Sequence, residues 1–348
     1  MPTMRAVMKK DAALGTSLVT VDVPKCGPDD VLLKVKAASI CGTDLHIYKW
    51  DSWAQGVIKP PLILGHEIAG EIVEIGARVE EGFAKGDLVS VESHIPCGKC
   101  YQCRHDMRHI CDDLKIVGVH RPGGFAEYLS IPAVCAWKNG PGITVEVAAL
   151  LEPLGNAVYA ASEAQVAGQN VAVFGCGPAG LFTIAACKAL GAVKVIAVDV
   201  NPKHLEMAGP MGADELLDGA DPTLMERLES HRGGAGLDIS IDMSGNHKAI
   251  VTAIRSLRKG GTFVAFGIPP GPIELNLAND VILTGRRILG IVGRHMFKTW
   301  ELMQRLIESG KLNPAPIITH RYALADFDEA IRVRASTDAK VGKVILTP

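Results

Sequence analysis

Four cysteines lie close together in the segment HIPCGKCYQCRHDMRHIC, which spans residues 94–111. They are Cys97, Cys100, Cys103 and Cys111, with the spacing C-x2-C-x2-C-x7-C. Four thiolates can complete the tetrahedral shell of a structural zinc ion, and a closed shell leaves no position for water or substrate. An iron–sulfur cluster also takes four cysteines, but the last one here lacks the proline that follows it in bacterial ferredoxins. The spacing therefore favours structural zinc and places the chemistry elsewhere.

Further candidate ligands are scattered over three segments. SICGTDLHIYKW carries Cys41, Thr43, Asp44 and His46, LILGHEIAGEIVEIG carries His66 and Glu67, and LLEPLGNAV carries Glu152. One cysteine, one histidine and one or two carboxylates can bind zinc and still leave a position for a substrate oxygen. A lone His or Cys in an apolar stretch is more often a core residue, so spacing alone does not decide this. The remaining cysteines, Cys26, Cys135, Cys176 and Cys187, are expected to be small buried residues.

A glycine-rich turn predicts a dinucleotide site. VAVFGCGPAG places Gly175, Gly177 and Gly180 after an apolar strand and at the start of a helix, and Asp199 ends the next strand. Such glycines let the backbone approach a pyrophosphate at the helix N-terminus. An acid in the position of Asp199 accepts hydrogen bonds from the adenine ribose and repels a 2′-phosphate, which favours NAD over NADP. The alternative is a doubly wound domain in which the glycine turn has no ligand.

The elements that must position these residues fall into two kinds. Residues 1–155 consist of short strands, such as 31–39, 67–76 and 86–93, separated by Gly and Pro. From about residue 158, strands alternate with helices, which predicts a doubly wound parallel sheet. Its strands are expected at 170–175, 194–200, 237–245 and 260–267, with helices at 180–192 and from about 202. A helix over 299–312 and a strand over 342–348 follow, and that strand could return to the first domain.

Composition narrows the class of protein. The chain has 348 residues, 48% hydrophobic, which is enough for two domains. A net charge of −2 without blocks of like charge argues against a nucleic-acid surface or a polybasic membrane patch. The first residues lack the apolar region of a signal peptide, so a cytoplasmic protein is expected, in which clustered cysteines bind metal more often than they form disulfides. The uncharged run 164–187 is long enough to span a membrane, but GCGPAG interrupts it, and a strand–turn–helix explains it.

Taken together, CGTDLH, GHEIAGEIVEIG, the four-cysteine lobe and GCGPAG resemble the zinc-containing medium-chain alcohol dehydrogenases, in order along essentially the whole chain. The resemblance implies an α/β protein: a mostly β, GroES-like catalytic domain over 1–155 with the structural-zinc lobe at 94–112, a Rossmann NAD-binding domain over 156–295, and a segment 296–348 that returns to the first domain. It also implies one catalytic and one structural zinc per chain and a homotetramer.

Further segments point to a substrate class within the family. HIYKWDSWAQ, HIPCGKC, EPLGNAV and GRHMFKTW are similar to members that oxidise the secondary hydroxyl of L-threonine to 2-amino-3-oxobutanoate. The alternative is a polyol such as sorbitol, or 2,3-butanediol, because GHE and EP also resemble the enzymes that oxidise these. Two alternatives come from other classes of protein. One is a catalytically silent NAD-binding protein, which would have lost zinc ligands, and the other is a nucleic-acid binder built on the cysteine lobe, which the balanced charge disfavours.

The resemblance also assigns roles by position. Cys41, His66 and Glu67 match the catalytic zinc ligands, Glu152 a nearby acid that coordinates intermittently or moves protons, and Thr43 with His46 a proton relay. On the cofactor side, Ala179, Asp199 and His204 match the adenosine half, and Phe266, Gly267, Ile268, Ile291 and Val292 match the nicotinamide half. Ala179 stands where a larger aliphatic residue is usual and His204 where Arg is usual. Both departures put the affinity for NAD in question and leave the chemistry intact.

An amino-acid substrate brings an ammonium and a carboxylate into a partly dry pocket, and buried charges need partners. Glu152 could face the ammonium, and His94 could hydrogen-bond the substrate. Arg294, in GRHMFKTW, could present a bidentate fork to the carboxylate. The alternative is that Arg294 serves the cofactor or the subunit surface and that His94 only packs.

Overall fold

The computed structural model describes residues 2–80, 82–336 and 340–348, in two compact units. The first unit contains the chain up to Pro153 together with Ile318–Pro348, and the second is Leu154–Ile317. The sequence placed the second boundary near residue 295, but the segment up to Ile317 belongs to the second unit. The reason is packing, because Trp300 is wholly buried and the turn Ala315–Ile317 contacts the second unit's helix Pro178–Ala189.

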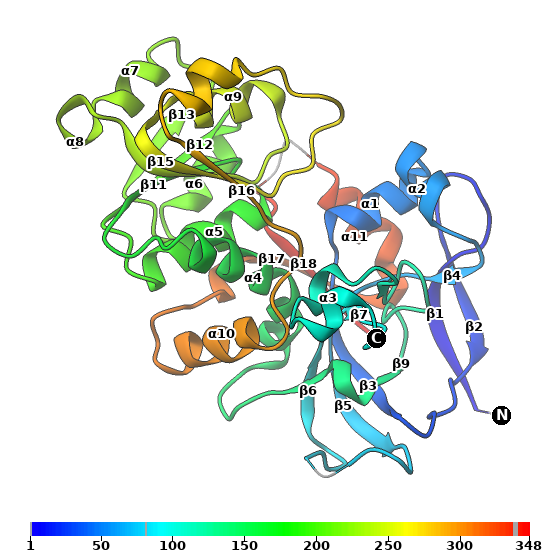
Figure 1. The fold of residues 1–348 in the computed structure, drawn as a ribbon. Coiled ribbons are helices and arrows are strands. Elements are labelled where there is room, and N and C mark those ends of the chain that lie inside the picture. The colour runs from blue at the N-terminus through cyan, green and yellow to red at the C-terminus, as the bar shows by residue number, and fades with distance from the viewer. Residues whose placement is uncertain (1, 81, 337–339) are drawn as a thin grey trace. The chain divides into compact units, whose positions relative to one another are not determined.

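The first unit is mostly β. Its strands are β1 (Thr3–Lys9), β2 (Ser17–Asp22), β3 (Asp30–Ser39), β4 (Leu62–Ile63), β5 (Glu67–Ile75), β6 (Leu88–Val91), β7 (His94–Ile95), β8 (Lys115–Ile116), β9 (Tyr128–Pro132), β10 (Ala136–Lys138), β17 (Ile318–Ala323) and β18 (Lys343–Thr347). Its helices are α1 (Gly42–Lys49), α2 (Ser52–Val57), α3 (Tyr101–Arg104) and α11 (Phe327–Arg334). The main sheet has the order β10-β6-β5-β3-β18-β17, with β9 also paired to β3 (Figure 1).

Two apolar clusters hold the first unit together. In one, side chains of β3, β5, β6 and β9 such as Leu33, Ile72 and Ile131 pack together. In the other, Ile47 of α1 packs with Phe327 of α11 and the ends of the sheet. β18 pairs in parallel with β17 and antiparallel with β3, so the last strand of the chain lies inside this sheet.

The second unit is a six-stranded parallel sheet with helices on both faces. The strands are β11 (Asn170–Phe174), β12 (Lys194–Asp199), β13 (Glu215–Asp218), β14 (Leu237–Asp242), β15 (Leu257–Ala265) and β16 (Arg287–Gly290). The helices are α5 (Pro178–Ala189), α6 (Pro202–Ala208), α7 (Leu224–Glu229), α8 (His231–Gly234), α9 (His247–Arg255) and α10 (Lys298–Glu308), and α4 (Val145–Glu163) leads into the unit. The sheet order β13-β12-β11-β14-β15-β16 confirms the predicted doubly wound fold.

Apolar side chains lie on both faces of this sheet, because successive residues of a strand point to opposite faces. Phe174 and Val198 pack against α7 and α9 on one face. Val173 points to the opposite face, where a Cβ placed on Gly180 of α5 would lie 3.7 Å from it. The strand order reverses between β11 and β14, and the crevice at such a reversal is where doubly wound sheets bind ligands.

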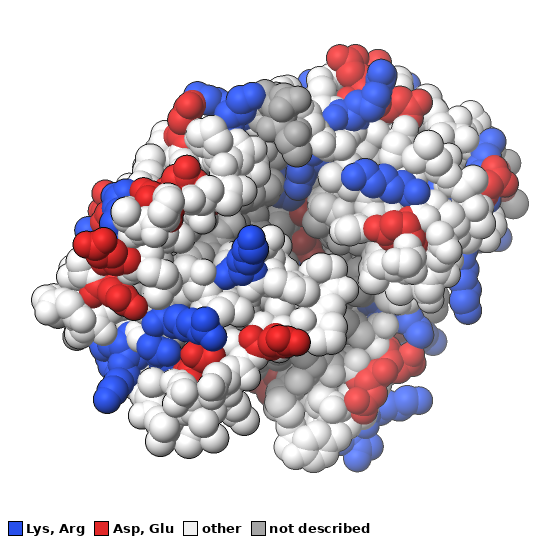
Figure 2. All heavy atoms as spheres, turned by 90° about the horizontal axis from the view of Figure 1, so that it is seen from above, with Lys and Arg blue, Asp and Glu red and all other residues white. Residues whose placement is uncertain are grey.

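Across the residues that the structure describes, every helix is too short or too polar to cross a bilayer. The uncharged run is divided between β11 and α5, as a strand–turn–helix. On the face drawn in Figure 2, Lys and Arg side chains alternate with Asp and Glu, without a large area of one sign.

Gly65 gives a stability prediction. It has φ +92°, and a Cβ there would lie 2.3 Å from Phe125 Cδ1, inside the cluster around α1 and α11. Gly65→Ala should therefore lower the free energy of unfolding by about 1–3 kcal/mol. The matched control is Gly56→Ala in α2, where no atom lies within 4 Å, and it should leave stability unchanged or raise it by up to about 1 kcal/mol. Denaturant unfolding of the full chain measures both, and equal losses would contradict this role of Gly65.

Candidate active site and metal centres

The four-cysteine lobe forms a compact ligand set. The Sγ atoms of Cys97, Cys100, Cys103 and Cys111 all lie within 4.8 Å of one another. The Cys100 and Cys111 sulfurs are 3.8 Å apart, and zinc–sulfur bonds of about 2.3 Å in a tetrahedron require about the same separation. A four-iron cluster would hold its cysteines further apart, because irons and sulfides fill the space between them. The geometry fits one zinc ion.

Hydrogen bonds from backbone N–H groups favour the thiolate form of two of these cysteines. The N–H of Cys100 donates to Cys97 Sγ at 3.4 Å, and that of Cys103 to Cys100 Sγ at 3.5 Å, where Cys100 caps α3. Such bonds from backbone N–H groups lower the pKa of Cys97, and that of Cys100 to about 6. Burial raises the pKa of Cys103 to about 12 and also raises that of Cys111. Ionising all four thiols therefore needs a cation, which is what a structural zinc supplies.

A second ligand set lies where α1 meets β5. One ligand atom each from Cys41, His66 and Glu67 falls within 4.8 Å of the others, and His66 and Glu67 are buried. Cys41 caps α1, and His66 and Glu67 follow Gly65 at the start of β5. Three ligands of these types leave a coordination position for a substrate oxygen. The structure brings together the three residues that the sequence assigned to a catalytic zinc.

Asp44 lies behind the His66 ring. Its Oδ2 accepts the N–H of Cys41 at 2.8 Å, and its Oδ1 lies 3.8 Å from His66 Nδ1. Burial raises the pKa of Asp44 to about 6. Burial alone would lower the pKa of His66, but the adjacent Cys41 and Asp44 hold it well above its usual value. Asp44 Oδ1 and His66 Nδ1 are both buried without a hydrogen bond to any residue that the structure describes. Metal-bound histidines commonly have a carboxylate beside their other ring nitrogen, so this arrangement also fits a cation.

Glu67 is wholly buried and has a cationic partner. Both of its carboxylate oxygens accept from Lys343 Nζ at 2.5 Å, and one also accepts from Ser39 Oγ. Ser39 comes from β3 and Lys343 from β18, so three neighbouring strands meet at this carboxylate.

Glu152 and His94 line the same region of the first unit. The negative charge of Glu152 helps Cys41 and Asp44 to raise the pKa of His66. Glu152 Oε1 accepts a hydrogen bond from Ser93 Oγ at 2.6 Å. Glu152 is not a member of the 4.8 Å ligand group. His94 is 9% exposed, and its Nδ1 lies 3.1 Å from Oε1 of the wholly buried Glu92. The pairing with Glu92 fixes the orientation of the His94 ring.

Thr43 and His46 follow Cys41 along α1. Thr43 Oγ1 is 3.8 Å from Cys41 Sγ. His46 is one helical turn further, with its side chain 58% exposed and its Nδ1 2.5 Å from Asp51 Oδ2. Asp51 also caps α2 by accepting the N–H of Ala54. The helix thus carries a hydroxyl beside the ligand set and an imidazole near solvent.

The glycine turn of the second unit has the geometry of a phosphate-binding loop. A Cβ on Gly180 would lie 1.8 Å from Gly175 O, and one on Gly175, at φ +89°, would lie 2.7 Å from Ser244 Cβ. Both positions therefore require glycine for packing. A Cβ on Gly177 would meet no atom within 4 Å, so that glycine keeps space open beside the N-terminus of α5. These three roles fit a dinucleotide pyrophosphate.

The other predicted cofactor residues lie at the carboxyl ends of the same strands. Asp199 ends β12 and contacts His204 in the first turn of α6, and Ala179 lies in the first turn of α5. Phe266, Gly267 and Ile268 follow β15, and Ile291 and Val292 follow β16. Ile291 is buried, whereas Ile268 and Val292 are exposed, so the turns after both strands present apolar side chains. One edge of the sheet thus carries the whole predicted set.

Arg294 lies in the interior of the second unit. It is wholly buried, its Nη1 donates to Asn156 Oδ1 at 3.1 Å, and its guanidinium carbon lies 5.7 Å from the centre of the Trp300 ring. A Cβ on Gly155 would lie 2.5 Å from its Cδ. Its contact with a substrate carboxylate stays a prediction, because His94 and the zinc ligands belong to the other unit.

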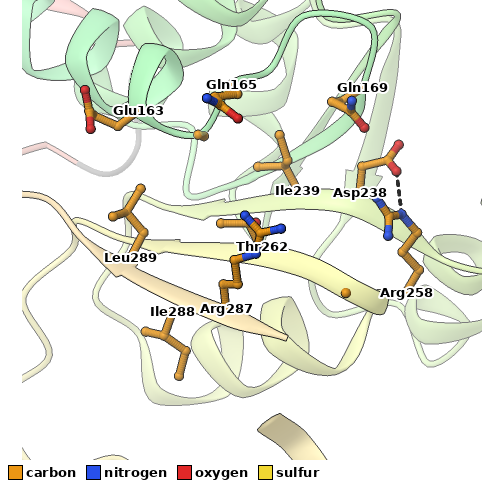
Figure 3. Close-up of a pocket in the computed structure, with 12 residues that line it drawn as sticks. Glu163, Gln165, Gln169, Asp238, Ile239, Arg258, Thr262, Arg287, Ile288 and Leu289 are labelled. Carbon is orange, nitrogen blue, oxygen red and sulfur yellow. Dashed lines mark hydrogen bonds and ion pairs between the residues drawn. The ribbon is translucent and has the colours of Figure 1, made fainter. Parts of the chain in front are cut away.

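A cavity of about 340 Å³ lies at the opposite edge of the parallel sheet. Its lining includes Gln169, Asp238 and Arg287, at the amino ends of β11, β14 and β16, and Thr262 of β15, which pairs with Arg287 (Figure 3). Arg258 pairs there with Asp238 at 2.6 Å. Because doubly wound sheets bind cofactors at the carboxyl ends of their strands, this cavity is separate from the predicted dinucleotide site.

Sequence reasoning missed several residues that support the ligand set. Lys343 and Ser39 hold Glu67, Ser93 holds Glu152, and Glu92 holds His94. A signal was present for two of them: Lys343 is a lysine in an apolar terminal strand, and Glu92 follows the apolar alternation of LVSV. Asp51 stabilises the end of the predicted relay in the same way.

Comparison with known proteins matches both units. The alcohol dehydrogenase GroES-like domain matches residues 27–141, and the zinc-binding dehydrogenase family matches residues 178–309. An L-threonine 3-dehydrogenase of Pyrococcus abyssi is 45% identical over 98% of both chains. A zinc-binding dehydrogenase of Sinorhizobium meliloti, crystallised with NADP, is 29% identical with a TM-score of 0.92 over the full length of both chains. The 2R,3R-butanediol dehydrogenase of Bacillus subtilis is 26% identical with a TM-score of 0.90 over 99% of both chains.

The family models extend over both units and include both cysteine-containing ligand sets, and the full-length structural match also includes the glycine turn. The chain is therefore an enzyme of the zinc-containing medium-chain alcohol dehydrogenase family.

Proposed function

We propose that the enzyme oxidises the secondary hydroxyl of L-threonine to 2-amino-3-oxobutanoate with NAD as the hydride acceptor, and that it holds one catalytic and one structural zinc. The observation that carries the proposal is the open ligand set of Cys41, His66 and Glu67, with Glu152 and His94 in the same unit. The relatives named L-threonine 3-dehydrogenase, at 45% identity, support threonine over the diol of the more distant 26% relative.

The two bound groups would supply the redox chemistry: zinc acts as a Lewis acid on the substrate hydroxyl, and the nicotinamide accepts the hydride. The chain holds zinc through Cys41, His66 and Glu67, while Asp44 orients His66 from behind. The four-cysteine lobe holds the second ion and has no open position. Asp199 and the glycine turn hold the dinucleotide.

The proton released from the hydroxyl needs a path out of the buried ligand set. Thr43 lies beside Cys41 and can pass a proton along α1. His46 is exposed at the outer end, and imidazole exchanges protons readily near neutral pH. Asp51 accepts from His46 Nδ1, so the ring would exchange its other proton at Nε2.

Recognition of an amino acid would use the acids and the imidazole near the ligand set. Glu152 can accept a hydrogen bond from the substrate ammonium while Ser93 Oγ donates to its Oε1 and fixes the orientation of the carboxylate. Because Glu92 accepts from His94 Nδ1, a hydrogen bond from His94 to the substrate would use Nε2. A polyol lacks the ammonium, so it would leave the Glu152 charge without this partner.

We further propose that the enzyme works as a homotetramer in the cytoplasm. Four large apolar side chains between 277 and 288, outside the predicted cofactor set, are exposed in the second unit: Leu277, Ile282, Leu283 and Ile288. β16 is the edge strand of its sheet in the part of the chain that the structure describes, so its second edge can pair with another copy. All nine cysteines are free thiols, which suits a reducing compartment.

The two zinc sites should differ in what they support. Cys97→Ser should remove the lobe's ion and lower the free energy of unfolding, because structural zinc binding is coupled to folding. Cys41→Ser should abolish NADH formation and leave the unfolding transition nearly unchanged. Zinc per chain, unfolding and turnover are measured on both variants, with the wild type at two zinc ions per chain. The same phenotype for both variants would refute the division of roles.

Substrate choice can be tested by NADH formation with L-threonine, sorbitol and 2,3-butanediol. The wild type should prefer L-threonine, and chelation should remove activity with all three. His94→Ala should cost on the order of ten- to a hundredfold in kcat/KM with L-threonine, through the loss of one charge-assisted contact. It should change the value for 2,3-butanediol by much less.

Glu92→Gln is the matched variant for ring orientation, since it keeps the volume and should cause a smaller, threonine-selective loss. Arg294→Ala is less informative because Arg294 is wholly buried and its removal disturbs packing. If His94→Ala reduced both substrates equally, His94 would act in general catalysis or folding. A wild type that prefers sorbitol or the diol would overturn the threonine assignment.

The assembly proposal predicts a molar mass four times the 36.9 kDa of one chain by light scattering. Ile288→Glu and Leu283→Glu, which put charges on the exposed apolar surface, should reduce that mass at unchanged secondary structure. A wild-type mass of one or two chains would refute the tetramer.

A further inference from the structure

The Asp199 carboxylate is occupied on both oxygens. Its Oδ2 accepts the backbone N–H of Cys176 at 2.6 Å and lies 3.2 Å from His204 Nδ1, and its Oδ1 accepts the backbone N–H of Asn201 at 2.8 Å. An ionised carboxylate only accepts, so His204 Nδ1 carries the proton in this contact. The side chains of Asp199 and His204 are 10% and 27% exposed, so the pair lies at the rim of the predicted adenosine site.

The number of lone pairs on this carboxylate limits what else it can accept. A carboxylate offers about four acceptor positions, and three hydrogen bonds already use Asp199. Two ribose hydroxyls need two positions, so one existing partner has to leave when both bind. The Cys176 N–H is fixed by the glycine turn and the Asn201 N–H by the start of α6, where Asn201 caps the helix. His204 is the partner that can rotate away.

We propose that His204 makes the choice between NAD and NADP depend on pH: the neutral imidazole yields Asp199 to the two ribose hydroxyls of NAD, whereas the imidazolium keeps Asp199 paired and attracts the 2′-phosphate of NADP. This inference rests on the dinucleotide site of the proposed function. It extends that function, because Asp199 by itself selects NAD at every pH.

Asp199 is the charged side chain that His204 contacts. The titratable side chains on α6 and on the elements packed against it are Lys203 and Glu206 on α6, Lys194 and Asp199 on β12, Glu215 and Asp218 on β13, and Cys187 and Lys188 on α5. Lys188 pairs with Asp214, Lys194 pairs with Glu215, and Asp218 accepts the N–H of Ala220. Burial raises the pKa of the Cys187 thiol to about 12, so it stays neutral.

Asp199 itself does not titrate in the range that matters. Burial alone would raise its pKa, but the hydrogen bonds from His204, Asn201 and Cys176 hold the pKa of Asp199 below its usual value. The carboxylate is therefore charged throughout the neutral range. Of the two side chains, the imidazole is therefore the one that a change of pH in the neutral range would affect.

Linkage fixes the sign for each cofactor. NAD takes the acceptor positions that stabilise the imidazolium, so its binding releases protons, and its affinity falls as the pH is lowered. NADP brings a negative phosphate toward the imidazole, so its binding takes up protons, and its affinity rises as the pH is lowered. The two dinucleotides should therefore show opposite proton linkage at the same residue.

Calorimetric titration of the zinc-loaded enzyme with NAD and with NADP, without substrate, tests this. Dissociation constants are measured at pH 6.0, 7.0 and 8.5, and the protons exchanged are counted from buffers with different ionisation enthalpies. His204→Gln, which is never charged, and His204→Arg, which is always charged, bracket the wild type. The 2′-phosphate gains its own second proton near pH 6, and both variants share this background.

The wild-type ratio of NAD to NADP affinity should fall about tenfold from pH 8.5 to pH 6.0, the size of one charge-assisted contact. Protons should be released with NAD, and the two variants should lose that release. Wild-type and variant profiles that run parallel, with tight binding retained, would overturn the role of His204 and leave the dinucleotide site intact. Absence of binding by either dinucleotide would overturn the dinucleotide site itself, and this inference with it.

Discussion

The first unit depends on the neutralisation of one buried carboxylate. Glu67 has no exposed surface, and taking an unpaired carboxylate out of water costs several kcal/mol. Lys343 contacts both of its oxygens, and Ser39 donates to one of them. These residues come from β5, β18 and β3, which are neighbours in the main sheet or separated by one strand. The position of the last strand and the position of a predicted zinc ligand are therefore set by the same ion pair.

The surroundings of this ion pair contain more acids than cations. Asp44, Glu92 and Glu152 are also buried, and the basic side chains that lie beside these acids are Lys343, His66 and His94. A site of this kind gains stability from a divalent cation, which suits the open ligand set. The four-cysteine lobe also gathers negative charge, but backbone N–H groups donate to its sulfur atoms. All of its ligands come from the single segment 97–111. A local, closed set suits a structural ion, and a set gathered from separate strands suits an exchangeable coordination position.

The sequence predicts best those features that depend on residues close together in the chain. The strands and helices of the second unit follow apolar periodicity, and the cysteine lobe and the glycine turn are continuous segments. Lys343 could not be assigned to Glu67, because 276 residues separate them and the contact depends on strand order. The pattern of α10 shows which face is buried but not which unit covers it, so the second boundary was misplaced. The burial of Arg294 was equally invisible, since an arginine in a loop segment gives no sign of its depth.

The discontinuity of the first unit has a consequence for biosynthesis. The ribosome makes the whole second unit before β18 emerges, so that unit can fold while the first still lacks its last strand. At about 5–20 residues per second, the time between the synthesis of β3 and that of β18 is on the order of ten seconds or more. During that time the edge of β3 that later pairs with β18 is open, and Glu67 has no lysine. Open strand edges recruit other chains, so the newly made protein is most prone to aggregate just before it completes its own sheet.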